Sequence, residues 1–337
     1  MASEGKNNLT VMNKKLHFLL IYLLLIFPFK VLCATDSYIS RQEIGAGTFI
    51  RITIQKGEKS AEIFNEAFSK IKEMEKIFSV YDSESEISCL NRQKKLKVSN
   101  ELLFLLKKSL YISSITKGAF DVTCKPLTDL YKRAKKRNYP PSDDEIQDVL
   151  KHIGWQNIRI ENNYVEIPEH SEIDFGGIAK GYIVDKTVNF LKEKGIKNGM
   201  VNAGGEIFAF GNNPHGKNWQ IGIRDPFSNN GIIKKIRVKN FGVATSGNYE
   251  NFFSIRGKKY GHIINPVTGR TVQDFPVSVT VIAPDCTTAD ALATAFFVLG
   301  GEKSLTIADS IEGIDVFIID GNRKIYESKN FSHLVLP

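Results

Sequence analysis

Two oxygen-bearing side chains, Asp290 and Thr294, interrupt an apolar stretch that lies between Thr288 and Gly300. A spacing of four residues places both on one face of a helix, and a helix that is otherwise apolar is expected to be buried. A buried carboxylate needs a strong partner, and a hard cation such as Mg²⁺ takes oxygen ligands together with substrate phosphates. The alternative is structural, with Asp290 capping the first turn and Thr294 bonding back to a carbonyl. The pattern is equally consistent with both.

A glycine-rich turn with a lysine, at residues 173–182, predicts a second polar site ahead of a helix. Gly176 and Gly177 can aim backbone N–H groups and the helix dipole at a phosphate, and Lys180 adds a positive charge. The run matches neither GxxxxGK[ST] nor GxGxxG, so it is not a Walker A loop or a dinucleotide fingerprint. An ordinary strand–turn–helix corner is the alternative. A second glycine turn at Asn202–Glu206 favours a cleft lined by backbone.

Ser246 and His262 are the pair that could suggest a nucleophilic hydrolase. No G-x-S-x-G elbow surrounds Ser246, which argues against that class. A single histidine in a strand is more often structural than catalytic, so the residue pattern alone gives His262 no role. The Pro-Val-Thr-Gly run at residues 266–269 predicts a turn.

The segments around these residues predict helices and hairpin-forming strands. Helices are expected at Ser60–Phe78, Leu102–Thr116, Tyr182–Lys194 and Ala289–Leu299, the last with Thr288 as N-cap and Gly300 as stop. Strands are expected at Gln42–Gln55, Ile158–Ile160, Tyr164–Ile167, Gly199–Val201, Glu206–Phe210, Trp219–Ile223, Ile232–Val238, Val277–Ala283 and Val316–Ile319. The polar stretch Lys132–Asp144 predicts a loop or the tip of an insertion. The irregular mixture predicts an α+β fold with a largely antiparallel sheet rather than a doubly wound parallel one.

The composition is that of a globular protein of 337 residues, 42% hydrophobic and 24% charged. The 22 Phe and 11 Tyr residues supply a sizeable core and exclude a disordered chain. The formal charge is +8, but the only dense basic cluster lies at residues 132–137, without a basic stripe of interleaved aromatic residues. This distribution argues against nucleic-acid binding and favours a solvated basic face or attraction to anionic ligands and membrane surfaces.

The N-terminus predicts export. Two lysines precede an apolar run over residues 16–29, and small residues follow at Cys33 and Ala34, as in a secretory signal. The run is shorter than the roughly 20 residues of a membrane-spanning helix. We expect residues 1–34 to be a signal peptide cleaved after Ala34, and the alternatives are a lipidated Cys33 or an uncleaved anchor. The mature chain is then expected at the periplasmic side of the inner membrane.

Three further cysteines, Cys89, Cys124 and Cys286, have neither CxxC nor histidine-paired spacing. Their odd number leaves no complete set of disulfides. They predict buried free thiols rather than a zinc or iron–sulfur site.

Taken together, the motifs resemble the ApbE family in order and spacing, from Gly47-Thr48 to the apolar C-terminal helix. The segments that carry the resemblance are Tyr81–Ser88 with Asn91-Arg92, Gly118–Thr123 with Pro126-Leu127, Asp174–Asp185, Asn202–Glu206, Ala244–Tyr249, His262–Gly269, and Ser278–Ile282 leading into Ala289–Thr294. Each is weak alone, and their common order makes chance implausible. Three positions depart from the usual family pattern: Ala46 where Met is frequent, Val122 where Pro is common, and Asn265 where Asp is common.

The resemblance implies a T-fold-related architecture in one compact unit over residues 38–330, with a smaller subdomain around the insertion. It implies Mg²⁺ bound by Asp290, Thr294 and a backbone carbonyl at Gly177. It makes His262 the catalytic base and counts Asp290 as catalytic too. The FAD contacts that it implies are Ala46, Tyr81, Ala119, Phe120, Asp121, Asp174, Lys180 and Ile264.

The activity implied by the resemblance is a magnesium-dependent transfer of FMN from its substrate FAD to a threonine or serine hydroxyl of an acceptor flavoprotein. The products would be AMP and a protein that carries FMN through a phosphoester. The alternatives are a magnesium-dependent FAD pyrophosphatase, which would release FMN and AMP, and a non-catalytic flavin-binding lipoprotein. The implied acceptors are subunits of membrane redox complexes or exported flavoproteins.

Overall fold

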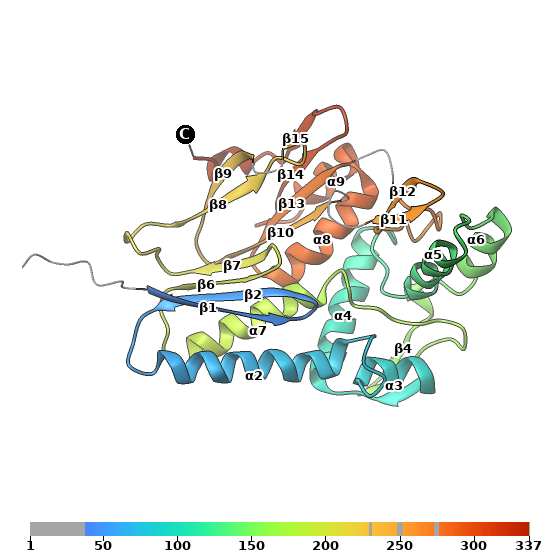
Figure 1. The fold of residues 1–337 in the computed structure, drawn as a ribbon, viewed down its shortest axis with the longest axis horizontal. Coiled ribbons are helices and arrows are strands. Elements are labelled where there is room, and N and C mark those ends of the chain that lie inside the picture. The colour runs from blue at the N-terminus through green and yellow to red at the C-terminus, as the bar shows by residue number, and fades with distance from the viewer. Residues whose placement is uncertain (1–37, 229–230, 248–251, 273–275, 337) are drawn as a thin grey trace, which may run out of the picture. The chain divides into compact units, whose positions relative to one another are not determined.

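An antiparallel sheet is the frame of the protein (Figure 1). The computed structural model describes residues 38–228, 231–247, 252–272 and 276–336. Within these residues, eight strands lie in the order β1 (Tyr38–Gly45), β2 (Thr48–Gln55), β6 (Gly199–Ala203), β7 (Glu206–Phe210), β10 (Phe241–Gly247), β13 (Ser278–Ala283), β14 (Asp315–Ile319) and β15 (Ile325–Glu327). Every neighbouring pair is antiparallel, which confirms the predicted α+β class with a largely antiparallel sheet.

Helices cover one face of this sheet because the strands present alternate apolar side chains to them. Ile50, Ile52 and Ile54 of β2 are fully buried in the core that the sheet shares with the helices. The covering helices are α2 (Ser60–Phe78), α4 (Asn100–Ile115), α7 (Ala179–Glu193), α8 (Cys286–Leu299) and α9 (Gly301–Ala308).

A hairpin covers the opposite face of the sheet. It consists of β8 (Trp219–Arg224) and β9 (Ile232–Val238), and the short η2 (Phe331–Leu334) packs beside it. Trp219 and Phe331 are buried there with apolar side chains from the sheet, in a second core. The sheet therefore has two buried faces with separate cores.

A smaller group of elements lies at the edge of the main core, around the predicted insertion (Figure 1). It comprises α5 (Lys125–Arg137), α6 (Asp143–Leu150), β11 (Phe252–Ile255) and β12 (Lys258–Gly261). Leu127, Tyr131 and Ile264 form its own small cluster of buried residues. The remaining elements are α3 (Glu86–Gln93), the three-stranded sheet of β3 (Lys95–Lys97), β5 (Tyr164–Glu166) and β4 (Arg159–Glu161), and η1 (Trp155–Asn157).

The prediction that Lys132–Asp144 is a loop or insertion tip is wrong for most of its length. The helix α5 continues to Arg137, because apolar side chains on one of its faces, such as Ala134, are buried. α5 ends at Asn138, which adopts the left-handed conformation with φ 51°. α6 begins after Ser142 with a capping box, so only five residues, 138–142, form the turn.

Other boundaries differ from the prediction, among them the start of α7, which begins at Ala179 instead of Tyr182. The segment Gln42–Gln55 is not one strand but the larger part of the β1–β2 hairpin, whose turn residues Ala46 and Gly47 have φ values of 50° and 71°. α8 begins three residues earlier than predicted, and its N-cap is Asp285 rather than Thr288. The Asp285 carboxylate accepts a hydrogen bond from Thr288 N at 2.6 Å, so Thr288 lies inside the first turn. Gly300 ends the helix, as predicted.

The contact between α7 and α8 positions the polar residues of α8. A Cβ at Gly181 would lie 2.3 Å from the carbonyl oxygen of Cys286, so only glycine allows this close approach. Asp185 of α7 accepts hydrogen bonds from Cys286 N at 2.8 Å and from Thr287 N at 2.8 Å. Burial raises the pKa of Asp185 to about 6, although these hydrogen bonds oppose the shift. The first turn of α8 is thus held by a half-buried carboxylate from its neighbour.

No helix in the described ranges is both long enough and apolar enough to cross a bilayer. The apolar run at 16–29 and the expected cleavage or lipidation at Cys33 and Ala34 lie outside the described residues. Of the three predicted free thiols, Cys286 is buried, whereas Cys89 and Cys124 are only half-buried.

Replacing Asp185 with Asn should lower the free energy of unfolding by about 1–3 kcal/mol, because the amide keeps one acceptor oxygen, whereas its NH2 group would face a backbone N–H donor from which it cannot accept. Urea denaturation of the purified protein measures this change. The matched control is Glu193→Gln, an exposed acid on the same helix, which should change stability by less than about 0.5 kcal/mol. Equal stabilities for the two variants would show that Asp185 does not hold α8.

Candidate functional site

A cavity of about 610 Å³ lies among the glycine turns, the N-terminal part of α8 and the loops around residues 119–124 and 262–266. Its size is in the range of pockets that bind small molecules and cofactors. The cavity brings together every site residue predicted from the sequence: Ala46, Tyr81, Ala119, Phe120, Asp121, Asp174, Gly177, Lys180, His262, Ile264, Asp290 and Thr294. Their individual roles stay predictions, but their convergence on one cavity is observed.

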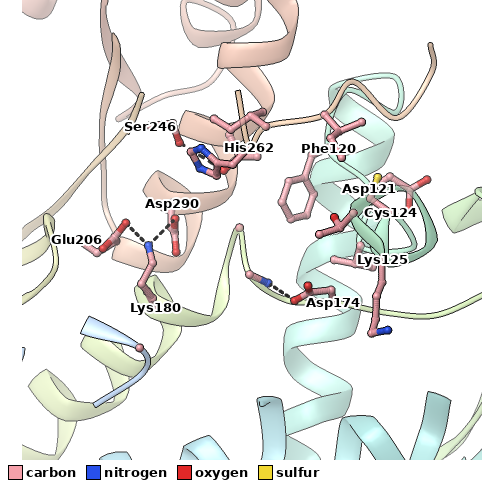
Figure 2. Close-up of a pocket in the computed structure, with 18 of the residues that line it drawn as sticks. Phe120, Asp121, Cys124, Lys125, Asp174, Lys180, Glu206, Ser246, His262 and Asp290 are labelled. Atoms are coloured by element: carbon pink, nitrogen blue, oxygen red, sulfur yellow. Dashed lines mark hydrogen bonds and ion pairs between the residues drawn. The ribbon is translucent and has the colours of Figure 1, made fainter. Parts of the chain in front are cut away.

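A charged cluster forms one end of the cavity, where Lys180 lies between Glu206 and Asp290 (Figure 2). Lys180 Nζ forms an ion pair with Glu206 Oε1 and lies 3.9 Å from Asp290 Oδ1. Both carboxylates are almost fully buried, with 4% and 3% of the residue exposed. Burial raises the pKa of Glu206 to about 7. Burial alone would lower the pKa of Lys180, but the two carboxylates outweigh it and hold that pKa above its ordinary value.

The oxygen atoms at this end fit a hard divalent cation. Asp290 Oδ2 accepts a hydrogen bond from Gly181 N at 2.9 Å, which leaves Oδ1 as the less committed oxygen. Two carboxyl groups face one ammonium group, and a cation bound beside them would favour the ionised form of both. Glu206 Oε2 is buried and has no hydrogen-bond partner among the described residues. Such a site is incomplete without a further positive or hydrogen-bonding group.

Thr294 supplies a hydroxyl beside Asp290, as the four-residue spacing predicted. Its Oγ1 lies 3.4 Å from Ser246 Oγ, at the long limit of a hydrogen bond. A Cβ at Gly177 would lie 3.2 Å from Thr294 Oγ1, so the backbone of the glycine turn passes directly beside this hydroxyl. Carboxylate, hydroxyl and backbone carbonyl are oxygen ligands of the kind that Mg²⁺ prefers.

The cavity does not hold a metal site built from side chains alone, as far as the described residues show. Among the residues that the structure describes, no three or more His, Cys, Asp or Glu side chains gather in a way that could hold a metal ion. A Mg²⁺ site at Asp290 would therefore depend on one carboxylate, a hydroxyl and backbone, with the remaining ligands supplied by substrate or water.

The opposite end of the cavity is built around two further acids, Asp121 and Asp174. Asp121 accepts hydrogen bonds from Thr123 N at 2.8 Å, Thr123 Oγ1 at 2.7 Å and Trp155 N at 3.1 Å. Asp174 Oδ1 accepts from Gly176 N at 2.9 Å (Figure 2). Burial raises the pKa of both carboxyl groups above the ordinary value. The two acids shape the loops of this wall as well as lining it.

The rim carries an unusually exposed aromatic residue. Tyr81 has 84% of its surface exposed, more than any other large hydrophobic residue described. Lys132 Nζ of α5 lies 5.4 Å from the centre of its ring, within cation–π distance. Ala46 lies on the rim too, in the tip of the β1–β2 hairpin, where its N–H donates to the Glu75 carboxylate. A flat ligand could stack on Tyr81 at this entrance.

His262 follows β12 and is exposed at the cavity, whereas the next two residues, Ile263 and Ile264, are buried and anchor the segment. In Figure 2 the imidazole lies on the side of Ser246 and Asp290, away from Asp121 and Asp174. This placement allows proton transfer near the charged cluster.

The departures from the family pattern are accommodated locally. Asn265 Oδ1 accepts hydrogen bonds from Val267 N at 2.9 Å and Thr268 N at 3.3 Å, a role in the turn that the oxygen of an Asp could fill equally. Val122 is buried in the cavity wall. Neither touches the charged cluster.

Glu206 is the main residue that the site prediction lacked. It closes the glycine turn at Asn202–Glu206, which the sequence singled out only for its backbone. A signal was present, because Glu206 opens the otherwise apolar strand Glu206–Phe210. Its partner Lys180 is 26 residues away, so the pairing itself required the fold.

Comparison with known proteins shows the family to which the chain belongs. A family model described as the ApbE family matches residues 46–318. The chain belongs to the ApbE family. The predicted membership of this family is thereby confirmed.

Individual ApbE-family relatives align along most of the chain. The FAD:protein FMN transferase of Vibrio cholerae is 33% identical over 310 residues, which cover 88% of this chain and 92% of that protein. The FAD:protein FMN transferase of Treponema pallidum is 30% identical over 315 residues, or 86% of each chain.

Solved structures agree with the fold. The flavin transferase ApbE from Vibrio cholerae superposes with a TM-score of 0.78 at 31% identity, covering 88% of this chain and 99% of that one. The ApbE protein from Thermotoga maritima superposes with a TM-score of 0.82 at 32% identity, covering 89% and 100%.

Proposed function

We propose that this ApbE-family chain transfers FMN from FAD to a threonine or serine hydroxyl of an acceptor protein and releases AMP. The observation that carries the proposal is the single cavity that collects all the predicted contacts. The relatives named FAD:protein FMN transferase, which align over more than four fifths of the chain, support the same reaction.

In the proposed reaction, the acceptor hydroxyl oxygen forms a bond to the phosphorus atom of the FMN half of FAD. The bond between that phosphorus and the bridging oxygen breaks, and AMP leaves with the bridging oxygen. His262 takes the hydroxyl proton, a task that suits an imidazole near neutral pH. Lys180 steadies the negative phosphate oxygens from the charged end of the cavity.

Asp290 Oδ1, Thr294 Oγ1 and the Gly177 carbonyl would hold Mg²⁺. When bound, this ion acts as a Lewis acid that neutralises charge on the pyrophosphate. The fit rests on the two buried carboxyl groups of the cluster and on the buried oxygen of Glu206 that has no partner among the described residues. The residues toward Tyr81, Phe120 and Asp174 are left to hold the flavin and nucleotide parts of FAD.

The proposed acceptors are subunits of membrane redox complexes or exported flavoproteins, and the chain is proposed to act outside the cytoplasm. The support is the sequence pattern of residues 1–34, which carries lysines, an apolar run and small residues in the order of a secretory signal. Lipidation at Cys33 and an uncleaved anchor are the alternative ways to reach the same compartment.

Incubation of the purified chain with FAD, Mg²⁺ and an acceptor domain should raise the acceptor mass by one FMN and release one AMP for each acceptor modified. Mass spectrometry and chromatography of nucleotides measure both. Omitting Mg²⁺, or replacing Asp290 with Asn, should abolish transfer, because the proposed cation site is lost. AMP and free FMN formed at full rate beside an unmodified acceptor would identify a pyrophosphatase, and bound FAD without turnover would identify a flavin-binding protein.

The His262→Ala variant should bind FAD as the wild type does but should transfer FMN slower by about a hundredfold or more, since it lacks the proposed base. Initial rates of acceptor modification, measured beside FAD affinity, separate the two effects. His215→Ala is the matched control, because His215 lies in a turn and does not line the cavity. Near-normal transfer by His262→Ala would remove this histidine from the role.

Intact-mass analysis of the chain isolated from cell membranes and periplasm should give a mature protein that begins at Thr35. An acylated chain beginning at Cys33 would support the lipoprotein alternative, and an unprocessed chain in the membrane would support the anchor. Unprocessed protein in the cytoplasm would contradict export.

A further inference from the structure

Three ionisable side chains lie at the buried end of the cavity. The ammonium group of Lys180 can pair with the carboxylate of Glu206 or with that of Asp290. Lys180 Nζ is paired closely with Glu206 Oε1 and lies 3.9 Å from Asp290 Oδ1. The shorter ion pair is with Glu206, so the structure shows the lysine committed to one acid and merely near the other (Figure 2).

The backbone of Lys180 cannot move away from Asp290. The next residue, Gly181, donates its N–H to Asp290 Oδ2 at 2.9 Å, and the close packing of Gly181 on Cys286 fixes α7 against α8. Only the lysine side chain is therefore free to select its partner, through rotation of its flexible stem.

The oxygen of Asp290 nearest to the lysine is also the oxygen that a metal would need. Because Oδ2 is occupied by Gly181 N, Oδ1 is the free acceptor of Asp290 on the cavity side. An ammonium group paired with Oδ1 would compete with a divalent cation for the same atom. An ion pair between Lys180 and Asp290 would therefore weaken the binding of a metal ion at Asp290.

The position of Glu206 is set by the turn that precedes it. It follows the turn Gly204-Gly205 at the start of β7, and a Cβ at Gly204 would lie 2.4 Å from Thr48 Oγ1, so the turn is packed tightly on β2. Its second oxygen, Oε2, is buried without a partner among the described residues. An acid that is buried with one oxygen unpaired is costly for folding, which points to a functional reason for its position.

We propose that Glu206 holds the Lys180 ammonium away from Asp290, and so keeps Asp290 Oδ1 available to the metal. Glu206 is in this sense a positioning residue that acts through Lys180. The inference rests on the proposed function for the location of the metal site, and it adds the requirement that the lysine be restrained.

The experiment is a double-mutant cycle on the full-length protein, with Mn²⁺ as the probe and its free concentration followed by electron paramagnetic resonance. Glu206→Gln keeps the shape but removes the charge, and should weaken Mn²⁺ binding about tenfold or more as Lys180 turns to Asp290. Lys180→Met should bind Mn²⁺ at least as tightly as the wild type. The double variant should bind as Lys180→Met does.

Each other result overturns the inference. Unchanged affinity in Glu206→Gln would show that the lysine needs no restraint, and a double variant as weak as Glu206→Gln would show that Glu206 acts on the metal directly. Weaker binding by Lys180→Met would give the lysine the opposite role. Wild-type protein that binds no Mn²⁺ would remove the metal site from Asp290.

Two controls isolate the effect. Glu193→Gln, an exposed acid on α7 that does not line the cavity, should leave Mn²⁺ affinity unchanged, and thermal unfolding shows whether each variant is folded. FMN transfer by the wild type is measured separately. If transfer is intact while the cycle fails, the inference falls and the proposed function stands.

Discussion

The close packing of α7 on α8 is the contact on which the rest of the site depends. It is possible only because Gly181 has no side chain, and it is secured by Asp185, which accepts hydrogen bonds from the first turn of α8. With the two helices fixed together, Lys180 on one and Asp290 on the other become neighbours. The charged end of the cavity is therefore a property of a helix–helix contact rather than of either helix alone.

Around that contact, charged and aromatic side chains occupy different parts of the cavity. The charged groups lie deep, where burial strengthens electrostatic interactions and where unpaired oxygens are costly. The aromatic and exposed groups, with Tyr81 foremost, lie at the rim. A ligand with a charged part and a flat, apolar part would find a charged environment deep in the cavity and an aromatic ring at its rim.

The parts of the site that the sequence predicts best are those that contrast with their immediate neighbours. Asp290 and Thr294 are recognisable because the helix around them is apolar, and the glycine turn before Lys180 is recognisable by composition. Long periodic helices such as α2 were placed to the residue. In each case the signal is local, within one or two turns of chain.

The features that the sequence did not predict depend on partners far away in the chain, or on an apolar pattern that charged residues obscure. In the sequence, Glu206 is a single acid after a turn, and only the fold brings Lys180 to it. Asp185 has its role because it binds Cys286 and Thr287, which lie 101 and 102 positions further along the chain. The end of α5 was taken for a loop because five of its last six residues are basic, which obscures the apolar face on the other side. Tertiary contacts, not propensity, decide such positions.

The order of the strands in the sheet has a consequence for the folding of the protein. β2 pairs with β6, so Ile50 lies opposite Ala203, and the cavity collects residues from Ala46 to Thr294. Pairings between segments that are far apart in the chain form slowly, because the entropy cost of closing a long loop comes before the stabilising contacts are made. The cavity is accordingly complete only when nearly the whole chain has folded. Occupation of the site by a ligand would thus report that the chain between Ala46 and Thr294 has folded.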